Sequence, residues 1–207
     1  MMSDDHDDTS AAELPHQRRV IIVGIPGVGK STVVAKVLEM LGSKGRQAKV
    51  VNFGTVMLEE AKLSAGVKSR DEIRKLPIEK QKALQIHAAT KIAETHGEFV
   101  IVDTHLFIAT KEGFWPGIPV DVLQALRPTN LVLVNAKPEE ILERRRGDET
   151  RSRDPATKES LEKELLAANA MLYSSSVLVG SPALAVDNAQ GAVDEAAMRI
   201  VEAITTS

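Results

Sequence analysis

Residues 19–31 read RVIIVGIPGVGKS, and this stretch decides the fold. Its first part, Arg19 to Gly24, is apolar, rich in β-branched side chains and ended by glycine, which predicts a buried strand. From Ser31 to Leu41 the apolar residues recur at three- and four-residue spacing, which predicts a helix that ends at residues 42–45. The stretch therefore predicts a strand, a glycine-rich loop and a helix in direct succession.

The loop matches the pattern G-x-x-x-x-G-K-[ST], the P-loop, which binds the phosphates of a nucleoside triphosphate. Its glycines let successive backbone N–H groups face phosphate oxygens, and the following helix adds its unpaired N–H groups and positive dipole end. Lys30 supplies a cation to the β- and γ-phosphates, and Ser31 offers a hydroxyl to Mg²⁺. The residues predicted to bind the triphosphate here are Gly24, Ile25, Pro26, Gly27, Val28, Gly29, Lys30, Ser31 and Thr32.

Strand and helix patterns alternate along the rest of the chain. Apolar strands are predicted at 49–53, 99–103, 130–134 and 184–187, and helices at 55–63, 69–76, 77–95 and 191–204. Strands of this kind between helices indicate a parallel sheet that is covered on both faces. The predicted fold class is therefore α/β, a three-layer P-loop fold with a five-stranded parallel sheet.

Composition and charge restrict the partners, the metal sites and the cellular location that we expect for the protein. The net charge of −3 gives no overall attraction to nucleic acid, and the absence of cysteine excludes disulfides and thiolate metal sites. We find no signal peptide and no apolar run near the roughly 18 residues of a membrane span, so we expect a cytoplasmic protein. Residues 1–17 are acidic and polar, and we expect a disordered tail before a single domain at 18–207.

Charged residues outside the P-loop point to the chemistry. Asp103 ends a predicted strand, at the place where P-loop proteins hold Mg²⁺ through its waters. Arg74 lies in the insert after the second strand, and a highly charged stretch at 143–154 contains further arginines, which predicts a flap. Fixed cations stabilise a migrating phosphoryl group, and so many of them favour two phosphate-bearing substrates over simple hydrolysis. The guanine-reading Asn-Lys-x-Asp of GTPases has no counterpart, because residues 135–138 read NAKP.

Four segments together resemble the archaeal type of adenylate kinase: Val50–Thr55, Asp71–Leu76, Val102–His105 and Arg144–Asp154. Gly113–Pro119 looks like that family's loop after the third strand. The resemblance runs from about residue 18 to the C-terminus. It implies an AMP-binding insert at about 55–95, a short lid at about 144–157, the reaction MgATP + AMP ⇌ 2 ADP and a homotrimer.

The same resemblance implies roles for individual residues. Arg74 would hold the AMP phosphate, and the AMP site would be lined by Asn52, Phe53, Gly54 and Thr55. Arg144 or Arg145 would lie near the ATP, while Arg151 and Arg153 would close over the transferring group. Catalysis would then rest on Lys30, Arg74, Arg151 and Arg153, with Ser31 and Asp103 beside the metal.

Two other functions remain open at the level of sequence. One is another small kinase, which acts on CMP, UMP, dTMP or an acceptor that is not a nucleotide. The other is a P-loop ATPase or nucleotide-dependent binding module, because the P-loop is common to all these classes.

Overall fold

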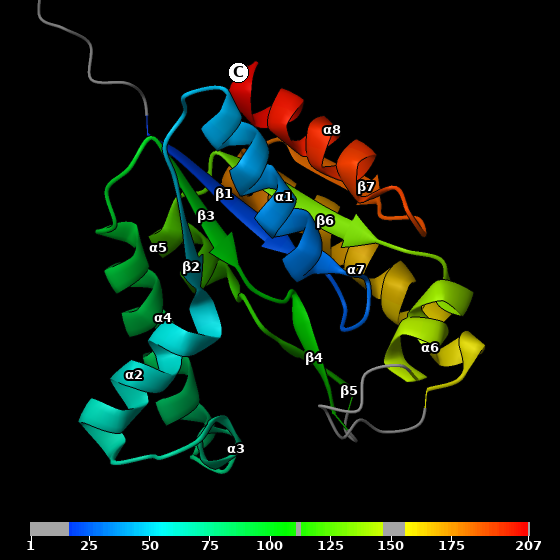
Figure 1. Ribbon diagram of the computed structural model, residues 1–207. Coiled ribbons are helices and arrows are strands. Elements are labelled where there is room, and N and C mark those ends of the chain that lie inside the picture. The colour runs from blue at the N-terminus through cyan, green and yellow to red at the C-terminus, as the bar shows by residue number, and fades with distance from the viewer. Residues whose placement is uncertain (1–16, 111–112, 147–155, 207) are drawn as a thin grey trace, which may run out of the picture.

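The computed structural model describes residues 17–110, 113–146 and 156–206. Its main sheet has five strands in the order β2–β3–β1–β6–β7 (Figure 1). Every pairing between neighbours is parallel, so the predicted five-stranded parallel sheet is confirmed. The strands are β1 (Arg18–Val23), β2 (Ala48–Asn52), β3 (Phe99–Asp103), β6 (Asn130–Asn135) and β7 (Ala183–Asp187).

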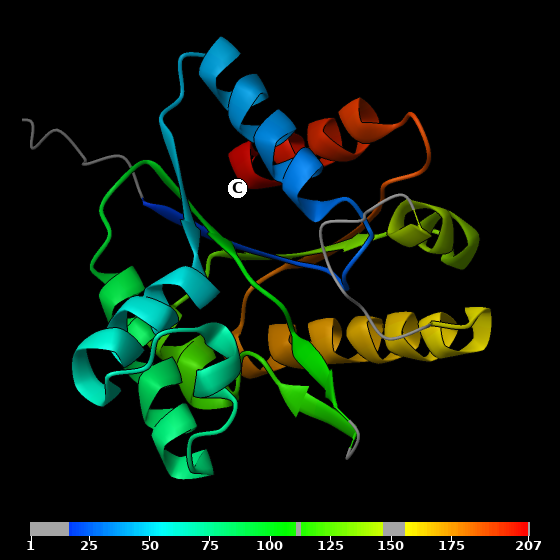
Figure 2. The same cartoon turned by 60° about the horizontal axis from the view of Figure 1, so that its bottom comes forward.

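Helices cover both faces of this sheet. On one face α1 (Lys30–Ser43) packs beside α8 (Val193–Thr205), and on the other lie α5 (Val120–Leu126) and α7 (Lys158–Val179) (Figure 2). Because both faces are covered, the central strands are buried along their length, with residues 20–23 and 99–102 at most 1% exposed. Removal of these apolar side chains from water holds the three predicted layers together.

A helical insert connects β2 to β3. It consists of α2 (Phe53–Ala65), the single turn α3 (Arg70–Ile73) and α4 (Ile78–Ala93), which packs on α2 and α5. Four of its residues form a small apolar cluster separate from the main core: Ala61, Val67, Ile73 and Leu84. The helices predicted at 55–63 and 77–95 are confirmed, whereas only 70–73 of the helix predicted at 69–76 is α-helical.

A β-hairpin follows β3, where the sequence predicted only a loop. Strands β4 (Phe107–Thr110) and β5 (Gly113–Pro116) pair antiparallel, and the rings of Phe107 and Phe114 contact each other at a tilt of 44°, with centroids 4.3 Å apart. The segment 113–119, expected as a loop, is thus one strand of this hairpin and the lead into α5. Figure 1 shows the hairpin projecting beyond the edge of the main sheet.

The first part of the charged stretch at 143–154, predicted as a flap, is helical. α6 (Pro138–Arg146) continues through its first four residues, so Arg144 and Arg145 belong to the last turn of a helix. Arg151 and Arg153 lie outside the described residues, as does the acidic segment 1–16. Among the residues that the structure describes, no helix has the length and apolar character needed to cross a membrane.

Candidate active site

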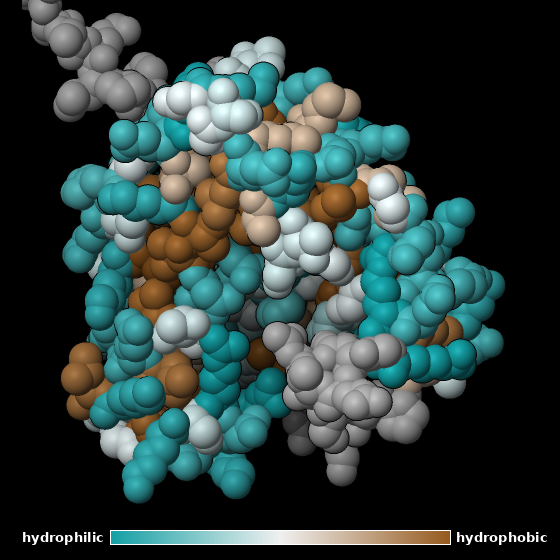
Figure 3. All heavy atoms as spheres, viewed as in Figure 1, coloured by the Kyte–Doolittle hydropathy of each residue, from teal (hydrophilic) through white to brown (hydrophobic). Residues whose placement is uncertain are grey.

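The carboxyl ends of the parallel strands β1, β2 and β3 lie at the same edge of the sheet. In the strand register, Ile22 of β1 and Asn52 of β2 both lie opposite Asp103 of β3. The segments that follow these strands are therefore neighbours, although they are distant in sequence. Figure 3 shows the surface hollowed at the centre of the view, between the region of the insert and that of the P-loop. Open parallel sheets bind their ligands outside such strand ends.

The P-loop joins β1 to α1 in a conformation that favours glycine at two of its positions. Gly27 and Gly29 have φ angles of 95° and 83°, in the left-handed region where a side chain is strained. At Gly29 a Cβ atom would also lie 2.4 Å from Nδ2 of Asn188. The side chains of Ile25 and Val28 are buried, at 5% and 0% exposed. These positions can therefore offer a ligand only their backbone groups.

Lys30 begins α1 and forms an ion pair with Oδ1 of Asp103. The side chains are only 9% and 16% exposed, so little water screens the pair. Burial lowers the pKa of Lys30, and the charge and hydrogen bond of Asp103 act in the opposite direction. The cation predicted for the phosphates is thus present in the site, where it is paired with the acid predicted for the metal.

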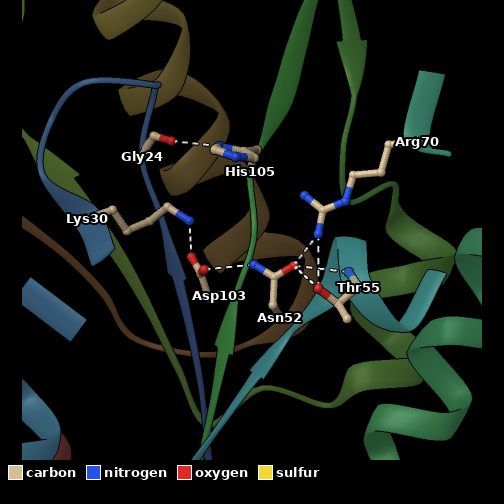
Figure 4. A network of polar contacts seen from close by, with 7 residues as sticks. All are labelled: Gly24, Lys30, Asn52, Thr55, Arg70, Asp103 and His105. Atoms are coloured by element: carbon tan, nitrogen blue, oxygen red, sulfur yellow. Dashed lines mark hydrogen bonds and ion pairs between the residues drawn. The ribbon is translucent and has the colours of Figure 1, made fainter. Parts of the chain in front are cut away.

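Asn52 lies at the centre of a polar network (Figure 4). Its Nδ2 donates to Oδ2 of Asp103 at 2.8 Å, while its Oδ1 accepts from the backbone N–H and the hydroxyl of Thr55, both at 3.0 Å. Nη2 of Arg70 donates to the same oxygen at 3.1 Å and to the Thr55 hydroxyl at 2.9 Å. Three donors on Oδ1 fix the orientation of the amide, so its N–H group must face the carboxylate.

Arg70, which begins α3, and Arg74, which follows it, have different partners. Arg70 reaches Asn52 and Thr55, and a Cβ atom at Gly54 would lie 3.3 Å from its guanidinium carbon. Arg74, which the sequence favoured, is 63% exposed in its side chain and pairs with Asp71 at 3.6 Å. Arg70 was missed because its role depends on the direction in which a four-residue helix points. Phe53, also predicted for this site, is buried in the main core at 3% exposed.

The structure brings Arg144 and Arg145 to the P-loop. Arg144 donates to the carbonyl of Val28 at 3.1 Å and to that of Asn188 at 2.9 Å. Arg145 donates to the carbonyl of Pro26 through Nε at 2.9 Å and Nη2 at 2.7 Å. Both predicted residues therefore touch the predicted phosphate site, through its backbone oxygens.

Two further residues contact the P-loop that sequence reasoning did not place there. Asn188, after β7, donates its amide N–H to the carbonyl of Val28 at 2.8 Å. Nδ1 of His105, after β3, lies 2.9 Å from the carbonyl of Gly24. Partial removal of the ring from water, and then the charge of Lys30, lower the pKa of His105. The short segment VDTH was the only sequence signal for His105, and Asn188 had none.

Two oxygen ligands for a metal ion are present beside Lys30. The Ser31 hydroxyl is solvent-exposed at the start of α1, and Asp103 offers a carboxylate. These hard donors suit Mg²⁺, which keeps several waters and binds with substrate phosphates through one or two protein oxygens. No group of three His, Cys, Asp or Glu that could hold an ion by itself occurs in the described ranges.

Comparison of the fold with known structures gives the class of the protein. Residues 23–162 match the family model described as AAA domain. Shikimate kinase from Acinetobacter baumannii, solved with shikimate, superposes with a TM-score of 0.58 at 15% identity, covering 93% of this chain and 95% of that one. Shikimate kinase from Bacteroides thetaiotaomicron gives the same TM-score at 13% identity, covering 90% and 97%. Together with the P-loop, Lys30 and the parallel sheet, these similarities define a P-loop kinase fold.

Sequence relatives give the family within this class. The chain is 43% identical over 186 residues to adenylate kinase of Methanocaldococcus jannaschii, covering 89% of this chain and 97% of the relative. It is 41% identical over 189 residues to adenylate kinase of Sulfurisphaera tokodaii, with the same coverage. The chain belongs to the adenylate kinase family, which confirms the family predicted from its motifs.

Proposed function

We propose that this protein catalyses the reversible transfer of the γ-phosphoryl group of MgATP to AMP, which gives two molecules of ADP. One observation carries the proposal beside the family membership. A continuous row of polar contacts runs from Lys30 in the P-loop through Asp103 and Asn52 to Arg70 in the insert. A hydrolase needs only the part of this row at the P-loop, which consists of Lys30 and Asp103. A phosphoryl transfer between two nucleotides also needs a second phosphate site beside the P-loop.

In this proposal the protein supplies position and charge. The phosphate of AMP attacks the γ-phosphorus, so no side chain has to act as a nucleophile. The P-loop and Lys30 hold the β- and γ-phosphates, and the arginines at 144, 145, 151 and 153 offset the negative charge of the migrating group. Mg²⁺, held by Ser31 and by Asp103 through water, would neutralise part of the phosphate charge when it is bound.

The acceptor site is proposed at Asn52–Thr55, on the insert side of Asp103. Arg70 joins Arg74 as a candidate for the acceptor phosphate, because Arg70 is the one that the fold holds against Asn52 and Thr55. Closure of the insert and of the lid over the substrates would exclude water, which would otherwise compete with AMP for the phosphoryl group.

A panel of nucleoside monophosphates, each tested with MgATP, decides the acceptor. We expect ADP formation that requires AMP and is much slower with CMP, UMP or dTMP. Phosphate release that does not depend on AMP would instead identify an ATPase, and a faster reaction with another acceptor would identify a different small kinase.

Two further expectations follow the family resemblance. We propose a homotrimer in the cytoplasm, with ATP and AMP as its small-molecule partners. Light scattering coupled to size-exclusion chromatography tests the trimer, and a mass equal to that of one 22.4 kDa chain would contradict it.

A further inference from the structure

Alternate carbonyl groups of the P-loop are hydrogen-bonded to side chains from three other parts of the chain. These side chains come from the segment after β3, from the last turn of α6 and from the segment after β7. The contacts are Gly24 with His105, Pro26 with Arg145, and Val28 with both Asn188 and Arg144, at 2.7–3.1 Å.

This alternation determines where the N–H groups point. The described peptide bonds are all trans, and in a planar trans peptide the carbonyl of one residue and the N–H of the next point in opposite directions. The N–H groups of Ile25, Gly27 and Gly29 therefore point away from the side chains that hold the preceding carbonyls. Within the described part of the chain these N–H groups donate to no protein acceptor.

We propose that Asn188 and His105 are positioning residues for the triphosphate. They hold the carbonyls of Val28 and Gly24 away from it. The N–H groups of the following residues, Gly29 and Ile25, therefore face its oxygens. The inference rests on the proposed function for the nature of the ligand. A carbonyl that turned toward a phosphate would add repulsion and remove a donor at the same time.

Asn188 is suited to this task because it is buried and neutral. It is only 5% exposed, and its amide lies where a side chain at Gly29 would be. Val28 has a second donor in Arg144, but an arginine can turn toward a phosphate when ATP binds. Asn188 would then be the remaining donor to Val28, so its loss should weaken the nucleotide-bound form more than the free form.

His105 holds the other end of the P-loop. A backbone carbonyl only accepts hydrogen bonds, so Nδ1 of His105 must carry the proton in this contact. An asparagine at 105 could present its amide N–H near the position of Nδ1, whereas a leucine has no donor. This difference gives a matched pair of variants at one position.

The test measures three dissociation constants by calorimetry, for inorganic tripolyphosphate with Mg²⁺, for ATP with Mg²⁺ and for AMP. Asn188→Leu and His105→Leu should each weaken tripolyphosphate and ATP about three- to tenfold, the fold-change that corresponds to one hydrogen bond. The affinity for AMP should stay the same, and His105→Asn should restore most of the loss. Thermal unfolding shows whether each variant is folded. If Asn188→Leu does not fold, the comparison of His105→Leu with His105→Asn tests the proposal by itself.

The proposal is overturned if tripolyphosphate binds both leucine variants as tightly as it binds the wild type, or if AMP weakens in parallel. Failure of His105→Asn to rescue His105→Leu would overturn the role of His105. Failure of the proposed function would look different, because the wild type would then bind tripolyphosphate and ATP but form no ADP from AMP.

Discussion

Asn52 and Asp103 lie opposite each other at the ends of β2 and β3, and Nδ2 of Asn52 donates a 2.8 Å hydrogen bond to Oδ2 of Asp103. The other carboxylate oxygen of Asp103 pairs with Lys30. One carboxylate thus contacts the residue that leads into the acceptor insert and the lysine of the P-loop. Substitution of the P-loop lysine should therefore affect turnover, whereas substitutions in the insert should affect the KM for AMP.

Lys30→Met should lower turnover about 100-fold or more, because it removes a fixed cation from the developing charge. Coupled assays of ADP formation at saturating ATP and AMP measure this loss. Lys44→Met, at an exposed position after α1, serves as the control and should retain wild-type turnover. A Lys30→Met enzyme with near-normal turnover would contradict the role given to Lys30.

Arg70→Met and Arg74→Met separate the two candidates for the acceptor phosphate. Loss of a charge-assisted hydrogen bond to phosphate costs about 1.5–3 kcal/mol, so Arg70→Met should raise the KM for AMP about tenfold or more. The KM for ATP should change little in either variant, because both arginines lie in the insert. A larger effect of Arg74→Met on AMP would show that Arg74 turns into the site when the insert closes, as the family resemblance implies.

His105 should make stability depend on pH in the acidic range. The fold lowers the pKa of His105, so the unfolded chain, with a histidine pKa of about 6.5, takes up the proton first as pH falls. The free energy of unfolding should therefore decrease below about pH 6.5, until the pH passes the lower pKa of the folded form. Urea titrations of the wild type and of His105→Asn between about pH 5 and 7.5 isolate this contribution. A constant difference between the two proteins across that range would contradict it.

Arg151→Met and Arg153→Met should each reduce turnover while leaving the free energy of unfolding unchanged. The proposed role of both arginines is to offset charge that develops only during transfer. Arg146→Met, at an exposed position in the last turn of α6, is a suitable control. Equal losses in all three variants would point to a general effect of positive charge instead of specific contacts.

Leu133→Ala should destabilise the fold by about 2–5 kcal/mol, because it leaves a cavity in the main core. Leu133 is 0% exposed in β6, which lies between β1 and β7 in the sheet. Leu178→Ala, at a position that is 60% exposed on α7, should stay within about 0.5 kcal/mol of the wild type. Denaturant unfolding measures both values, and similar losses at the two positions would show that Leu178 is covered in solution.

The parts of the fold that sequence predicted well are those whose signals are local. The strand β1, the P-loop and α1 follow one another within a single motif, and their apolar spacing is regular. The hairpin β4–β5 was missed because its second strand has four residues and contains both a glycine and a proline, which weaken the pattern of a strand. Its two phenylalanines, Phe107 and Phe114, become neighbours only when the hairpin forms.

The candidate site shows the same division between local and long-range information. The P-loop residues could be predicted one by one, because a contiguous pattern specifies them. Asn188 could not, since its partner Val28 is 160 positions away in the chain. The choice between Arg70 and Arg74 depends on which way a single helical turn faces, and residue spacing does not determine that direction.

The pairing of Lys30 with Asp103 means that the lysine already has an anion of its own. A triphosphate that binds the P-loop would therefore exchange one negative partner for another, and its affinity would reflect the difference between two ion pairs. Asp103→Asn would remove the negative charge of this internal competitor. Substitutions at the end of β3, the strand next to β1, could in this way change the affinity for the nucleotide during evolution, with no change in the P-loop itself.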